Sequence, residues 1–346
     1  MRKFLIAICC LFILVLPVSA MDFQAPSAPD TAQKYIDEET ESFSEGLWYI
    51  ICSTLSAIKP EIHEACKNSM FLVAIALLTS VSSNVIKLGS SLNNLVFTLA
   101  VSCVLIKPAN SYISLGIATI QQLSEYGKVL LPVMTSAMAA GGGTTTAAAN
   151  YAATSIFDTI LCNGISEILI PLLYVFMCLS ITRCATEHNA IMALKNGIKW
   201  LIAWTLKIAL YIFTGYLTVT GVVSGSVDSS ALKAAKIAIS GTVPVVGSII
   251  SDASESILVS AGVMKNAAGV YGILTFIAVF LSPFLTIGVQ HILLKITAGI
   301  CSIFSSKKTV DLILDFSTIM GFLLAMTGSI CLLHLISTVC FMKGIA

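Results

Sequence analysis

The stretch SVDSSALKAAKIAISGTVPVVGSIISDASESILVSAGVMKNAAG, from Ser226 to Gly269, lies between long apolar runs and is more polar than either. A side-chain oxygen of Asp228 or Ser229 can cap a first helix, because it accepts the free N–H groups of the first turn. The polar residues of this helix recur every three or four positions and form one stripe: Ser229, Lys233, Lys236 and Ser240.

A turn is predicted after this helix, around Pro244. Proline disfavours helical backbone in the residue before it, and Gly241 and Gly247 flank the segment. A second amphipathic helix is predicted over residues 248–263. The two helices then form a hairpin within residues 226–269.

The first helix of this hairpin carries two cations and the second carries two anions. In a hairpin closed at Pro244, Lys236 is level with Asp252 and Lys233 with Glu255. We hypothesise that these ion pairs set the register; the alternative is four separately solvated charges. Each helix is shorter than the roughly 20 residues that a membrane span needs. We therefore expect a hairpin that is re-entrant, interfacial or packed on the extracytoplasmic side.

Residues 224–258, SGSVDSSALKAAKIAISGTVPVVGSIISDASESIL, resemble the signature region of the stage III sporulation protein AE family of endospore-forming bacteria. The resemblance extends, in pattern, to an export signal, an acidic first segment and several membrane spans. It implies a structural membrane subunit of an eight-protein set made in the mother cell.

By the same resemblance, the set joins a forespore membrane protein across the intermembrane space and connects the two compartments. This connection supports late forespore transcription. Another member of the set resembles a secretion ATPase. The resemblance implies no catalytic residue and no cofactor for this chain.

Composition indicates an integral membrane protein. Hydrophobic residues make up 57% of the 346-residue chain and charged residues only 11%, against about 25% charged residues in soluble domains. The net charge is +1, and no basic patch with interleaved aromatic residues occurs, so binding to nucleic acid has no support. The lipid bilayer and other membrane subunits are the expected partners.

Three parts of the chain are expected. Residues 1–20 have the charged start, apolar centre and small final residues of a signal peptide, with cleavage after Ala20 or an uncleaved anchor as the alternatives. Residues 21–67 form an acidic extracytoplasmic segment, either a solvated helix or a docking surface. Residues 68–346 form a multi-span membrane domain that includes the hairpin.

The fold class is an all-α polytopic membrane protein with about six spans plus re-entrant or interfacial hairpins. Residues 109–140 are expected to form short helices dipping into the membrane, with one broken span as the alternative. Residues 141–149, three glycines followed by three threonines and three alanines, are expected in a loop at the surface or in a protein-lined cavity, because lipid leaves backbone groups unsatisfied. The expected spans are 69–86, 92–106, 156–181, 200–223, 270–294 and 319–341.

Two charges of opposite sign lie deep inside consecutive expected spans. An intramembrane charge costs about 2.5–3.5 kcal/mol on insertion scales, so it usually faces a partner or water. Glu167 and Lys207 are at similar depth in consecutive spans, and we propose that they pair, as structural glue or as part of a pathway. His334 is interpreted as a packing residue. Asp158 with Glu167 only weakly suggests a proton relay, which needs more ionisable groups at matched depth.

The orientation is predicted from lysine and arginine in short loops. The basic groups placed inside are Lys87, then Arg183, Lys195 and Lys199, then Lys295, Lys307 and Lys308. Lys107, Lys128, Lys343 and the hairpin are placed outside, and the lysines of the hairpin argue against the rule unless Asp252 and Glu255 compensate them. Both chain ends then lie outside.

No enzyme chemistry is expected. The sequence contains no Cys-x-x-Cys, no Gly-x-Ser-x-Gly and no phosphate-binding loop, and His63 lacks the second histidine of a zinc protease. We therefore expect no catalytic, cofactor-binding or metal-binding residues. Cys52 and Cys66 share the expected external segment, as a disulfide or as free thiols.

A second function class fits the residues without the resemblance. Short broken helices, a hairpin and buried charges are features of secondary transporters, whose substrate sites form where membrane helices break. A transporter or permease is therefore the alternative to a structural subunit.

Overall fold

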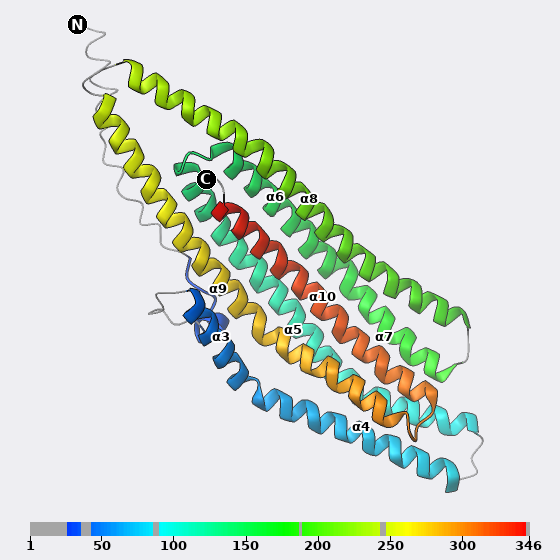
Figure 1. Cartoon of the computed structure of the whole chain (residues 1–346). Helices are drawn as coiled ribbons and strands as arrows, with labels where there is room; N and C mark the ends of the chain where they lie inside the picture. The colour runs from blue at the N-terminus through cyan, green and yellow to red at the C-terminus, as the bar shows by residue number, and fades with distance from the viewer. Residues whose placement is uncertain (1–25, 36–42, 86–89, 187–188, 243–246, 344–346) are drawn as a thin grey trace.

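The protein is a bundle of long helices, shown in Figure 1 as a computed structural model. The structure describes residues 26–35, 43–85, 90–186, 189–242 and 247–343. It does not describe the side chains of residues 79, 82–95, 97, 218–262 and 264. Within these ranges all regular structure is helical: α2 (Asp30–Gln33), α3 (Phe43–Ala57), α4 (Lys59–Val85), α5 (Ser90–Ala140), α6 (Thr144–Asn163), the π-helical η1 (Gly164–Leu169), α7 (Ile170–Ala185), α8 (Asn189–Thr242), α9 (Gly247–Cys301) and α10 (Lys307–Lys343).

Five segments of the described chain are long and apolar enough to cross a membrane: Thr98–Ala140, Thr144–Ala185, Asn189–Leu217, Lys265–Cys301 and Lys307–Lys343. The predicted all-α polytopic membrane fold is thereby confirmed. About six spans were predicted; residues 69–86, the first of them, fall in α4 and are not among the five.

Helix α10 is the central element of the bundle. It packs against α5, α6, α7, α8 and α9, and its buried side chains run from Thr309 to Phe341. Figure 1 shows α5 to α10 as long antiparallel rods. The span of α8 is the least buried of these five segments, so α8 forms one flank of the bundle.

Helix α5 corrects the prediction for residues 92–140. The expected short span and dipping helices are one unbroken helix of 51 residues with Pro108 and Pro132 inside it. A proline removes one helical hydrogen bond, but membrane helices tolerate this where neighbouring elements re-satisfy the freed groups, and α4, α6, α7, α9 and α10 pack against α5. Lys107 and Lys128 therefore lie within a helix and not in outside loops.

The three glycines at 141–143 form the tight turn between α5 and α6, as predicted, but the rest of the expected loop, residues 144–149, is helical and begins α6. Gly142 has φ 91°, and its N–H donates to the carbonyl of Ala139, while Gly143 N–H donates to Met138. This is a Schellman motif, which needs a residue with positive φ that only glycine adopts without strain.

The stretch 226–269 is built differently from the expected pair of short helices. Residues up to Thr242 continue α8, a helix of 54 residues, and residues from Gly247 begin α9, a helix of 55 residues. The two arms are thus extensions of spanning helices, because no proline separates either arm from its span. Residues 243–246, Pro244 among them, lie outside the described residues.

The N-terminal helices α2, α3 and α4 lie along α9, and α4 also contacts α5. Ala32 and Tyr35 are buried in this contact, and the Tyr35 hydroxyl lies 3.4 Å from Ser282 Oγ. Cys52 in α3 and Cys66 in α4 are free thiols.

One end of the bundle gathers charged side chains. The end of α7, the start of α8 and the connection at 302–306 lie there (Figure 1), so residues predicted on one side of the membrane lie at one end. Arg183 pairs with Asp311 at 3.3 Å, and Lys195 pairs with Asp315 at 2.6 Å. Residues 307–315 are the first part of α10, where Asp311 and Asp315 tie α7 and α8 to the central helix.

Candidate functional site

The most buried charged group in the described part of the chain lies between α5, α6, α9 and α10. Along α6, Asn150, Thr154 and Asp158 recur every four residues and are all buried, so they form one polar stripe. Along α10, His334 and Ser337 are buried opposite this stripe. We call Ser124, Thr154, Asp158, His334 and Ser337 the polar cluster.

Asp158 is the centre of the polar cluster. Ser124 Oγ of α5 donates to Asp158 Oδ2 at 2.7 Å, and His334 Nε2 of α10 lies 3.1 Å from Asp158 Oδ1. The side chains of Asp158 and His334 are each only 2% exposed. The contact is an ion pair when the imidazole carries two protons and a hydrogen bond from Nε2–H when it carries one. In either state it joins α6 to α10.

The imidazole of His334 is held on several sides. The Phe276 ring of α9 stacks on it, with ring centroids 4.8 Å apart and an interplanar angle of 8°. Gly127 of α5 lies against its edge, since a Cβ added there would be 2.1 Å from His334 Cε1. Only glycine therefore permits this approach of α5 to α10.

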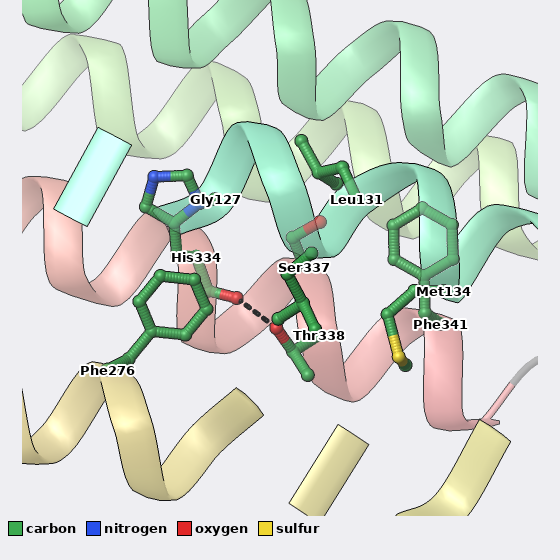
Figure 2. A pocket seen from close by; sticks show the side chains of 9 residues that line it. Gly127, Leu131, Met134, Phe276, His334, Ser337, Thr338 and Phe341 are labelled. Carbon is green, nitrogen blue, oxygen red and sulfur yellow. Dashed lines mark hydrogen bonds between the residues drawn. The ribbon is translucent and has the colours of Figure 1, made fainter. Parts of the chain in front are cut away.

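A second layer of polar contacts lies one turn away. The hydroxyls of Thr154 and Ser337 are hydrogen-bonded to each other between α6 and α10. Thr338 Oγ1 donates to the His334 carbonyl at 2.8 Å, the dashed line in Figure 2. Asn150 Oδ1 is buried and has no hydrogen-bond partner in the described part of the structure.

The space around the cluster is very small. Figure 2 shows His334, Phe276 and Ser337 around a cavity whose free volume is about 10 Å³, close to the minimum that one water molecule needs. This cavity beside His334 is therefore too small for a substrate. The arrangement can hold helices together and can hold or exchange a proton.

The residues predicted for the hairpin are spread over the ends of two long helices. Lys233, Lys236 and Gly241 belong to α8, and Gly247, Asp252 and Glu255 to α9. The side chains of all four charged residues lie outside the described ones, as does Pro244. The two ion pairs and the turn therefore stay predictions.

Glu167 lies in η1 and Lys207 in α8, and both side chains are exposed. Among the described residues, Arg183 forms a salt bridge with Asp311 and Lys195 forms one with Asp315. Neither salt bridge involves Glu167 or Lys207. The pairing of Glu167 with Lys207 within one chain stays a prediction.

Sequence reasoning noted Asp158 and His334 separately but did not join them. The two residues are 176 positions apart, and His334 was interpreted as a lone packing residue. A signal was present in the spacing of the polar residues, because Asn150, Thr154 and Asp158 share one face of α6. Nothing in a single sequence indicated which helix this face meets.

The fold and site define a polytopic helical membrane protein whose last helix is joined to α5 and α6 through a closed polar cluster. A family model described as stage III sporulation protein AE matches residues 31–344. This chain belongs to the stage III sporulation protein AE family.

A relative in Bacillus subtilis (strain 168), also called stage III sporulation protein AE, is 23% identical over 249 residues. The match covers 69% of this chain and 62% of that relative. No solved structure matches the chain.

Proposed function

We propose that this protein is a structural membrane subunit of a channel or secretion-like complex that links mother cell and forespore during sporulation. Its partners are other membrane subunits of the complex and a forespore membrane protein across the intermembrane space. It lies in the mother-cell membrane that engulfs the forespore, with its N-terminal segment on the extracytoplasmic side, and late forespore gene expression depends on it.

The family match over residues 31–344 carries this proposal. The geometry supports a structural role in two ways. The cavity beside His334 is too small to admit a substrate, and the ion pairs Arg183–Asp311 and Lys195–Asp315 fix outer helices to α10. Both features suit a scaffold that keeps one shape.

The test is made in an endospore-forming host that lacks its own family member. Expression of this chain is expected to restore a late forespore reporter, and tagged protein is expected in the engulfing membrane together with other subunits. Full late expression without any family member, or protein confined to the forespore membrane, contradicts the proposal.

One observation favours the alternative of a transporter. Two cavities of about 340 and 200 Å³ lie side by side along α5 and α9 and share Lys34, Tyr35, Leu115, Ser282 and Pro283. Pro283 lies inside α9, where it frees a backbone carbonyl, and cavities beside a helix irregularity are where transporters bind substrates.

Reconstitution separates the two functions. The purified chain in liposomes is expected to move no solute on its own if it is a scaffold. Replacing Ser282 by leucine places a larger side chain in both cavities. Solute uptake by the wild-type chain that falls in this variant favours the transporter.

A further inference from the structure

Two exposed charges of opposite sign lie at the same depth of the bundle. Glu167 precedes the end of α7 at Ala185 by 18 residues, and Lys207 follows the start of α8 at Asn189 by 18 residues. At 1.5 Å per residue, each lies about 27 Å along the bundle from the connection at 186–188.

This depth falls in the middle of the apolar zone. On α8 the next charge between Lys207 and the connection is Lys199, which lies about 15 Å from the connection. On α6 the next charge beyond Glu167 is Asp158, which lies about 40 Å from the connection. Between these levels, Glu167 and Lys207 are the charged residues of the described parts of α6, η1, α7 and α8. The interval is close to the roughly 30 Å thickness of a bilayer core.

Each charge lies on an outward face of its helix. On α6–η1–α7 the exposed side chains Ile160, Asn163, Glu167, Pro171 and Tyr174 recur every three or four residues. We call these five residues the acidic stripe.

On α8 the exposed side chains Trp200, Trp204, Lys207 and Tyr211 recur in the same way, and the two tryptophan rings stack with centroids 5.4 Å apart. We call these four residues the basic stripe. Both stripes face away from α10 and are otherwise mostly apolar or aromatic.

We propose that the acidic stripe of one copy of this protein packs against the basic stripe of a second copy, with Glu167 of one copy paired to Lys207 of the other. A bare charge at mid-membrane is unfavourable, so residues of this kind usually pair with one another. The occupant of the surface is thus a second copy of the chain.

A second copy fits because the bilayer fixes the height of every copy. Copies inserted with the same orientation place Glu167 and Lys207 at the same level, so equal depth within one chain gives equal depth between chains. Each copy carries one anion and one cation there, and the pairing leaves neither charge unmatched.

Charge reversal tests the contact. Two differently tagged copies of the full chain are produced together in a host that makes no spores, extracted in mild detergent and purified through one tag. Wild-type copies are expected to copurify. Glu167→Lys copies and Lys207→Glu copies are each expected to self-associate about tenfold less or worse, because like charges then meet at the contact.

The decisive sample mixes the two single variants. A Glu167→Lys copy and a Lys207→Glu copy have complementary charges, so they are expected to copurify with each other although neither associates with itself. If the ion pair is within one chain, the mixture stays dissociated and only the double variant Glu167→Lys/Lys207→Glu recovers. That result overturns the proposal.

Two further measurements complete the experiment. Lys199→Glu reverses an exposed charge on the same helix but outside the stripe, and it is expected to self-associate like wild type. Far-UV circular dichroism of each variant must show wild-type helix content, so that dissociation reflects the contact. Wild-type copies that fail to copurify, or single variants that associate like wild type, also overturn the proposal.

Discussion

Replacing Gly127 by alanine tests the packing of the polar cluster directly. The new methyl group would lie 2.1 Å from His334 Cε1 and 2.6 Å from Nδ1, so the imidazole must move. Moving it breaks the contact with Asp158 and the stacking on Phe276. We expect Gly127→Ala to destabilise the protein although alanine is the better helix former.

The magnitude follows from three terms. Overpacking a well-packed interior costs about 1–3 kcal/mol, and loss of a hydrogen bond to a charged group costs about 1.5–3 kcal/mol. Replacing a helical glycine by alanine returns about 1 kcal/mol. The net destabilisation is roughly 1.5–5 kcal/mol, which exceeds the average of about 1 kcal/mol for single substitutions.

The assay is unfolding by SDS in mixed micelles, followed by circular dichroism. The matched control is Gly197→Ala on α8, where an added Cβ meets no atom within 4 Å and stability should be unchanged or slightly raised. In a His334→Ala background the ring is absent, so Gly127→Ala should lose most of its penalty. Equal stability of the two alanine variants, or an unchanged penalty without the ring, refutes the reasoning.

The remaining predictions concern the charged end and the glycine turn. Lys195→Ala leaves the carboxylate of Asp315 without its partner at a largely buried site, and should cost about 3–5 kcal/mol in the same unfolding assay. Arg183→Ala breaks a partly exposed pair with Asp311 and should cost less than about 1 kcal/mol. Equal costs for Lys195→Ala and Arg183→Ala would contradict the argument that the more buried ion pair contributes more. Gly142→Ala imposes φ 91° on a residue with a side chain and should cost about 1–2 kcal/mol, whereas a neutral result contradicts the Schellman turn.

The spans and the glycine turn were predictable because they depend on local properties. Apolar runs of sufficient length, such as 270–294 and 319–341, lie within α9 and α10, and three consecutive glycines ended α5. The length of α5 was not predictable from local signals. Pro108 is typical of a helix end in water, but inside a bundle the neighbouring helices keep α5 continuous.

The polar cluster depends on pairing between distant segments. Asp158 and His334 were each visible as polar residues in apolar runs, but which helices pack together is decided by the whole bundle. The depth of Glu167 and Lys207 was predictable by counting residues. The outward direction of Glu167 was not, because η1 is π-helical between α6 and α7 and shifts the phase of the helix faces there.

The wide separation of Asp158 and His334 has a consequence for biosynthesis. Chains are made from the N-terminus, and N-terminal parts fold first, so α6 enters the membrane while α10 has not yet been synthesised. Until then the Asp158 carboxylate lacks its histidine, and a carboxylate that stays buried without its partner is unfavourable. A chain that stops before α10 therefore displays an unmatched acid on α6, and this distinguishes unfinished molecules from finished ones.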